Sequence, residues 1–149
     1  MMKHNIIQKM GIFAMVTSLI SCSAAQPSEI TYIPTSFQYE EYGGMENVRY
    51  SISYDREKGK IIVENNHKTK KYSVNINEVN QKIDAFILKY DLTNWQHQET
   101  EEIALDAPTE SIEITCENGF SFTLNSEEEH MYNSESVILK FRELIQTFY

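Results

Sequence analysis

Residues 112–124 read Ile-Glu-Ile-Thr-Cys-Glu-Asn-Gly-Phe-Ser-Phe-Thr-Leu, and this stretch decides the fold. Apolar and polar residues alternate on both sides of Asn118-Gly119, as they do in strands that bury one face. An Asn-Gly pair between two such runs predicts a β-hairpin closed by a type I′ turn. The apolar face of this hairpin needs a cover, which must come from elsewhere in the chain.

Two amphipathic helices are predicted to supply that cover, because apolar residues recur at spacings of three and four in two segments. The first segment follows Asn75, and Asn75 with Glu78 resembles a capping box, while Val74 and Val79 occupy hydrophobic staple positions. Its apolar face is Val79, Ile83, Phe86, Ile87 and Tyr90. The second segment runs from Ser134 to Tyr149, with Val137, Ile138, Phe141, Leu144, Ile145 and Phe148.

Between Phe37 and Val74 the apolar residues follow a period of two, which predicts strands. Turn-forming residues interrupt the pattern at Tyr42-Gly43-Gly44, at residues 55–59 and at Asn65-Asn66-His67. We therefore expect a meander of three or four antiparallel strands. The predicted fold class is α+β, a two-layer sandwich in which the meander and the C-terminal hairpin form one antiparallel sheet, with both amphipathic helices on one face.

The N-terminus has the three parts of a secretory signal. Lys3 and Lys9 supply positive charge, an uncharged apolar stretch runs from Met10 to Ile20, and small residues follow from Ser21 to Ala25. The apolar stretch is shorter than the roughly 20 residues that a membrane-spanning helix needs. We therefore interpret this segment as a leader, not as a transmembrane helix.

Leu19-Ile20-Ser21-Cys22 resembles the lipobox of bacterial lipoproteins at all four positions. The resemblance implies that residues 1–21 are a lipoprotein signal peptide and that the thiol of Cys22 receives a diacylglyceryl group. The membrane is then a partner through this anchor, and we expect a location in the bacterial cell envelope, at the outer membrane. Ordinary cleavage after Ala25 is the alternative, since Ser23-Ala24-Ala25 also fits a small-x-small rule. Residues 22–34 would form the lipidated cysteine and a polar tether.

Residues 35–149 are expected to form a single acidic α+β domain, which resembles small bacterial lipoproteins in outline only. Loss of the leader removes Lys3 and Lys9 but no acidic residue, so the formal charge changes from −9 to −11. Such a charge disfavours nucleic acid and anionic lipid surfaces as partners. Basic proteins and divalent cations are easier to accommodate, and no cofactor motif is present in the sequence.

The most suggestive polar group is His97 with Glu99, Glu101, Glu102 and Asp106. Imidazole and carboxylate ligands on one strand face could hold a divalent metal, although this segment lacks strand-like alternation. A second acidic run, Glu127-Glu128-Glu129-His130, precedes the last helix, where negative charge interacts favourably with the helix dipole. Cys116 falls on the apolar phase of its strand and is interpreted as a buried hydrophobe, with no partner for nucleophilic catalysis.

Two further features concern surfaces. The segment Phe37 to Tyr42, with its Gly43-Gly44 tip, could be a strand edge that contacts a carbohydrate or peptide, because tyrosine is common at interfaces. A basic group is predicted to protect a sheet edge from strand addition: Arg56, Lys58, Lys60, Lys68, Lys70 and Lys71.

The sequence favours a membrane-tethered, non-catalytic binding or accessory lipoprotein with a protein or glycan partner. Two alternatives are a metal-dependent hydrolase that uses His97 and the acids near it, and an inhibitor of a cationic hydrolase.

Overall fold

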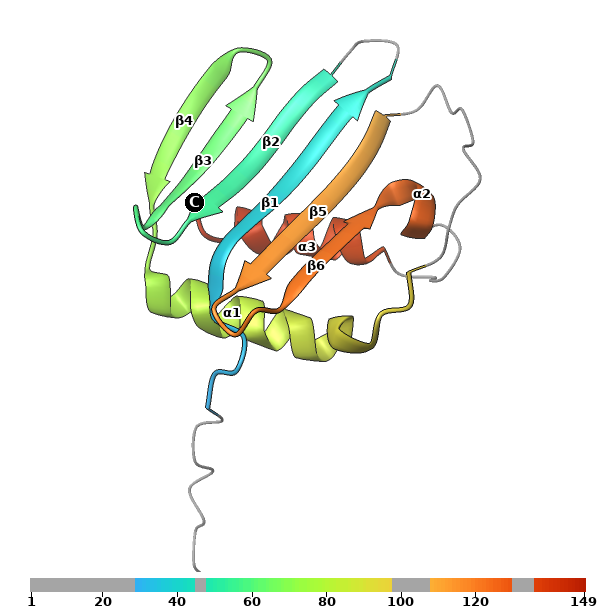
Figure 1. Ribbon diagram of the computed structural model, residues 1–149. Coiled ribbons are helices and arrows are strands. Elements are labelled where there is room, and N and C mark those ends of the chain that lie inside the picture. The colour runs from blue at the N-terminus through green and yellow to red at the C-terminus, as the bar shows by residue number, and fades with distance from the viewer. Residues whose placement is uncertain (1–28, 45–47, 98–107, 130–135) are drawn as a thin grey trace, which may run out of the picture.

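The computed structural model describes residues 29–44, 48–97, 108–129 and 136–149 (Figure 1). These residues form six strands and four helical segments. The sheet is antiparallel throughout, in the order β4-β3-β2-β1-β5-β6. The elements are β1 (Pro34–Gly43), β2 (Val48–Asp55), β3 (Lys60–Asn65), β4 (Lys68–Ser73), α1 (Ile76–Lys89), the 3₁₀ helix η1 (Leu92–Asn94), β5 (Pro108–Cys116), β6 (Ser121–Asn125), α2 (Ser126–Glu129) and α3 (Val137–Gln146).

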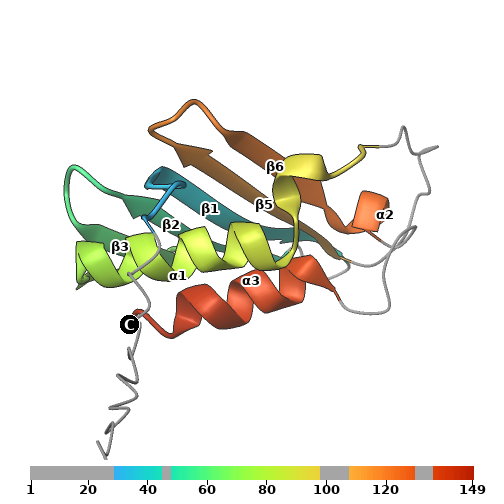
Figure 2. The same ribbon diagram turned by 90° about the horizontal axis from the view of Figure 1, so that it is seen from below.

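The fold class is the predicted one. The meander has four strands, and the β5–β6 hairpin joins it along the side of β1 that β2 leaves free. Figure 2 shows α1 and α3 side by side on the same face of this sheet. The chain is therefore an α+β two-layer sandwich, with one sheet face packed on helices.

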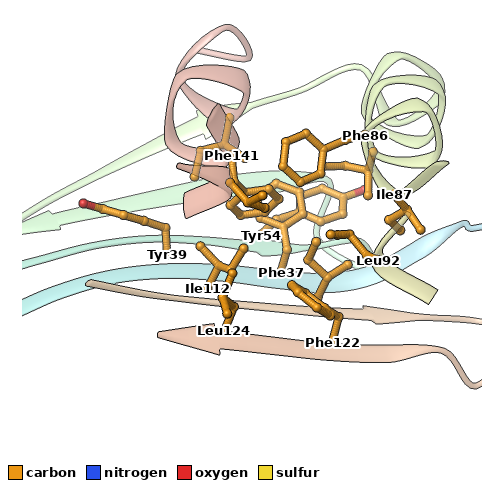
Figure 3. Close-up of a cluster of buried hydrophobic side chains, with 14 of the residues drawn as sticks. Phe37, Tyr39, Tyr54, Phe86, Ile87, Leu92, Ile112, Phe122, Leu124 and Phe141 are labelled. Atoms are coloured by element: carbon orange, nitrogen blue, oxygen red, sulfur yellow. The ribbon is translucent and has the colours of Figure 1, made fainter. Parts of the chain in front are cut away.

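The core lies between the sheet and the two long helices (Figure 3). The Phe37 ring on β1 stacks on Tyr54 at a centroid distance of 4.9 Å and meets Phe141 of α3 edge to face at 5.6 Å. Phe141 in turn lies 5.3 Å from Phe86 of α1. Aromatic pairs add to the free energy of area burial, so this chain of rings couples both helices to the centre of the sheet.

The capping of α1 follows the prediction in part. The side chain of Asn75 accepts hydrogen bonds from the backbone N–H groups of Asn77 and Glu78, as an N-cap residue does. The Glu78 carboxylate forms an ion pair with Lys82 at 2.7 Å, one turn further along the helix. The cap is therefore present, and Glu78 stabilises the helix through this pair.

The predicted type I′ turn at Asn118-Gly119 is wrong. Thr115 pairs with Ser121, and the Gly119 N–H donates to the Cys116 carbonyl, so the loop has three residues and only Gly119 has positive φ, at 86°. This is the geometry of a type I turn followed by a left-handed residue. A two-residue loop would have placed Ile114 opposite Thr123 and thus broken the common apolar face.

The two-residue turn with positive φ at both positions connects β3 and β4 instead. Asn66 and His67 have φ values of 40° and 82°, and the flanking Asn65 and Lys68 are paired. Both values match a type I′ turn. The sequence predicted a break here but not its type, because neither turn position is a glycine and other residues adopt positive φ uncommonly.

The segment assigned to the tether is partly folded onto the domain. The backbone N–H groups of Thr31 and Tyr32 donate to Oδ1 of the buried Asp84 on α1, at 3.0 and 2.7 Å. The Tyr32 ring meets Phe120 edge to face, and β1 already begins at Pro34. The described chain is therefore fixed to the domain from Thr31 onward.

Candidate functional site

His97 lies three residues after the end of η1 and contacts a residue far away in the sequence. Its Nδ1 is 2.8 Å from Oε1 of Glu128 on α2, and the Trp95 indole N–H donates to the same oxygen at 3.4 Å. The Glu128 side chain is 10% exposed, whereas that of His97 is 55% exposed. An exposed imidazole is thus held by a nearly buried carboxylate.

The geometry of this pair limits its chemistry. A carboxylate at Nδ1 favours the tautomer that carries its proton there, which leaves Nε2 as an acceptor facing away from the pair. Such an imidazole can act as a general base when a substrate proton comes within hydrogen-bond reach. The centroid of the His97 ring also lies 5.9 Å from that of the core residue Phe122, so the pair contacts the margin of the core.

The acidic residues that were predicted to accompany His97 cannot be placed. Glu99, Glu101, Glu102 and Asp106 lie outside the described residues. Within the described ranges, no three His, Cys, Asp or Glu side chains come close enough to hold a metal ion. Glu128 was missed as a partner because 31 residues separate it from His97 and no motif spans such a distance.

Two glutamates of the second acidic run, Glu128 and Glu129, make different contacts. Glu129 accepts hydrogen bonds from the Ile138 backbone N–H at 3.0 Å and the Ser136 hydroxyl at 2.7 Å. It therefore lies at the N-terminus of α3, where its charge interacts favourably with the helix dipole, as predicted. Glu128 faces His97 instead, and His130 lies outside the described residues.

Cys116 is buried, as predicted, with 3% of its surface exposed. Burial raises the pKa of its thiol to about 11, so the thiol is protonated near neutral pH. A protonated, buried thiol is a poor nucleophile. Cys22, the predicted site of lipid attachment, lies outside the described residues.

The prediction that Phe37 to Tyr42 forms an edge is wrong, because β1 pairs with both β2 and β5. The tyrosines are distributed mainly through the core, where Tyr39 and Tyr54 are buried. Tyr42 differs, since half of its surface is exposed at the end of β1. Of the two tyrosines in this segment, only Tyr42 is exposed enough to contact a partner.

Tyr39 connects the sheet to α3 through an ionic network. Its hydroxyl donates to Oε1 of Glu110 at 2.6 Å and accepts from Arg142 at 3.2 Å. Arg142 also donates to Glu110 at 3.1 Å and lies 4.0 Å from Glu41. Burial, followed by the hydrogen bond to Glu110, raises the pKa of Tyr39 above its ordinary value. The arrangement fixes the position of α3 and presents no free reactive group.

The sheet face turned away from α1 and α3 is mostly polar, with Ile62 as an apolar residue near its centre. Side chains alternate along each strand, so the residues between the buried ones face the opposite side. No described helix covers this face in either view (Figures 1 and 2). Its central residues are Gln38, Glu40, Tyr42, Arg49, Ser51, Ser53, Ile62, Glu64, Ser111, Glu113 and Thr123, and we call this surface the open face.

A hollow of about 500 Å³ lies at the end of the open face where β1 and β2 are connected. Its lining includes Tyr42 and Arg49, which are paired across the strands, together with Glu40, Ser51 and Glu64. We call it the distal hollow, since β1 begins at the opposite end of the sheet, beside the N-terminal residues that are fixed on Asp84. At 3.3 Å per residue, Tyr42 lies roughly 25 Å from Pro34 along β1.

The basic residues lie largely where the sequence predicts them. Lys68, Lys70 and Lys71 belong to β4, which is an edge strand. Arg56 forms an ion pair with Glu117, and Lys58 forms one with Asp55.

A second hollow of about 460 Å³ lies between α1 and α3 on the helix layer, lined by Ala85, Phe86 and Leu144 with lysines among its other residues.

Comparisons with known proteins add no functional label, since the sequence matches no protein-family model and no curated protein. Among the described residues, no helix has the length and apolar character needed to cross a membrane.

Proposed function

We propose that this chain is a membrane-tethered, non-catalytic binding or accessory lipoprotein of the bacterial cell envelope. Leu19-Ile20-Ser21-Cys22 supports the lipid anchor, and we place the protein at the outer membrane. The observation that carries the binding role is the open face, a broad polar sheet surface with an exposed tyrosine and a hollow of its own. Polar surfaces with a few aromatic residues suit non-obligate recognition.

The position of the N-terminal segment supports this role. Thr31 and Tyr32 are held against α1 at the end of the sheet where β1 begins. Attachment through Cys22 then leaves at most nine residues before Thr31, a reach of about 30 Å at full extension. The domain stays close to the bilayer, and the end of the sheet that carries Tyr42 is remote from the point of attachment.

The partner is a protein or a glycan of the envelope or of a host. The formal charge of −11 after loss of the leader disfavours nucleic acid. The same charge favours basic partners, and inhibition of a cationic hydrolase is one specific form of this function.

Photo-crosslinking in living cells tests the role of the open face. A photoreactive amino acid is introduced in the full chain at Gln38 or Glu113, which lie on the open face. Matched controls carry it at Gln81 and Gln146, which are exposed on α1 and α3. We expect a discrete crosslinked product from the open-face positions and none from the helix positions. Equal products from both faces, or none from either, would contradict the proposal.

A second candidate is a hydrolase in which His97 is the general base and Glu128 orients it. The 2.8 Å contact between the two side chains favours this candidate. Hydrolysis of a test ester or phosphate ester by the wild type, lost in both His97→Gln and Glu128→Gln, would support it. Activity that survives both substitutions would exclude it. The metal-dependent form further requires that zinc or EDTA shift the thermal melt of the wild type but not that of His97→Gln.

A further inference from the structure

Two carboxylates of the distal hollow lie in one row across three strands. The register places Glu40 opposite Ser51 and Ser51 opposite Glu64, so two glutamates flank a small residue in one row across β1, β2 and β3. Neighbouring strands lie about 4.8 Å apart, which puts the two glutamate backbones roughly 10 Å from each other. Their flexible side chains can converge on a group that lies above Ser51.

The carboxylates of this row are available. Glu40 accepts a hydrogen bond from Gln38 at 2.6 Å. Neither Glu40 nor Glu64 belongs to any of the ion pairs found among the described residues. Glu40 and Glu64 outnumber Arg49, the one cation among the residues that line the hollow, so its open-face side chains carry net negative charge.

Tyr42 adds an aromatic surface beside these charges. It lines the hollow and is 50% exposed, the largest exposed fraction among the aromatic residues at this end of the sheet. A ring face attracts cations, and the attraction is about 0.5–1 kcal/mol at exposed sites. Carboxylates next to an exposed ring form a site for ammonium or guanidinium groups, and they would repel an anionic ligand.

We propose that the distal hollow binds lysine or arginine side chains presented by a basic segment of a partner protein. This inference rests on the proposed binding function and names the chemistry of the partner. The negative charge of the whole chain steers such a segment toward the domain. The uncharged positions around the hollow, Ser51, Ser53 and Ser111, let the backbone of the segment approach the open face closely.

A binding measurement with a basic peptide tests the inference. The full chain in non-ionic detergent is titrated with a peptide of alternating arginine and glycine, and with the corresponding glutamate and glycine peptide as control. We compare the wild type with the double variant Glu40→Gln/Glu64→Gln. A matched double variant, Glu29→Gln/Glu57→Gln, makes the same change in charge at exposed positions outside the hollow.

We expect the hollow variant to weaken binding of the arginine peptide about tenfold, through loss of two charge-assisted contacts. The matched variant should weaken it by no more than about twofold, the effect of a screened distant charge. Tyr42→Ala should weaken binding about threefold and Tyr42→Phe should not, since only the ring is required. Unchanged thermal melts will show that the variants are folded.

Two results would overturn the inference: equal weakening by both double variants, which indicates only general electrostatic attraction, and absence of binding by the wild type. Tighter binding of spermine than of the peptide would also overturn it, in favour of a small polycation. The crosslinking experiment separates this failure from that of the proposed function. If Glu40→Gln/Glu64→Gln still crosslinks to its partner from Gln38, the inference fails and the binding function stands. If the wild type gives no crosslink, the binding function fails.

Discussion

Tyr39 shows which contacts of a single residue can be predicted from the sequence and which cannot. Tyr39 is fully buried, yet its hydroxyl reaches a carboxylate and a guanidinium at the margin of the core. It lies in the segment whose period-two pattern predicts a strand, and the structure confirms that strand. Its polar partners, Glu110 and Arg142, could not be predicted, because they come from β5 and α3 and meet it only after the sheet has formed.

Tyr39→Phe removes this hydroxyl while keeping the ring. We expect a loss of about 1 kcal/mol in the free energy of unfolding, since the retained Arg142–Glu110 pair satisfies part of the charge. Tyr42→Phe is the matched control and should change stability by less than about 0.5 kcal/mol, because its side chain is half exposed. Urea unfolding monitored by circular dichroism measures both. Equal losses would show that the network around Tyr39 contributes nothing specific.

Alkaline pH should destabilise the fold. Burial raises the pKa of Cys116 from 9.0 to about 11, and it also raises the pKa of Tyr54. In both groups the folded chain retains the proton longer than the unfolded chain does, so stability falls as pH rises through this interval. We expect the urea midpoint to decline from about pH 9, with the contribution of the thiol lost by about pH 11. Cys116→Ala should give a shallower decline over that interval, and an unchanged slope would contradict the assignment to the thiol.

At the scale of elements, periodicity predicted the helices and strands well and the turns less well. Most of the predicted α1 and α3 faces is buried, since spacings of three and four fix which residues point together, and Tyr90, Leu144 and Phe148 are partly buried at the margin. The β5–β6 turn was assigned from the Asn118-Gly119 pair alone. The pairing of Ile114 with Phe122, which the apolar alternation already required, is compatible only with an odd loop length. The alternation of apolar residues was therefore a better guide to the loop length than the Asn118-Gly119 pair.

The turn between β3 and β4 provides a test at this scale. His67 adopts a φ of 82°, a left-handed conformation that costs a non-glycine residue about 1 kcal/mol. His67→Gly should therefore stabilise the protein by about 0.5–1 kcal/mol. His67→Ala keeps the strain and should not stabilise it. Thermal unfolding of the three chains measures the difference, and a gain from alanine equal to that from glycine would rule out relief of backbone strain as the cause.

At the scale of the whole molecule, the fold was predictable and the candidate sites were not. Strand and helix faces are properties of neighbouring residues, so the layer order follows from the sequence. The distal hollow depends on Glu40, Ser51 and Glu64, which belong to three strands and meet only through the register. The His97–Glu128 pair likewise forms through tertiary packing. Function therefore has to be tested at the surfaces that the fold creates.

Membrane attachment is the claim on which the proposed function most depends. The chain has two cysteines, and Cys116 is buried in the domain, so Cys22 is the residue available for lipid. Cys22→Ala should abolish attachment, whereas Cys116→Ala is the matched control and should retain it. Two or more acyl chains hold a protein firmly on a bilayer, so the wild type should fractionate with membranes.

The decisive measurement is the intact mass of the full-length gene product after expression in a bacterium and extraction from its membranes. We predict a mature chain that begins at Cys22 and carries a diacylglyceryl group, in the wild type and in Cys116→Ala. Cys22→Ala should lack the lipid mass. An unmodified chain that begins at Gln26 and is released from the membrane would contradict the account.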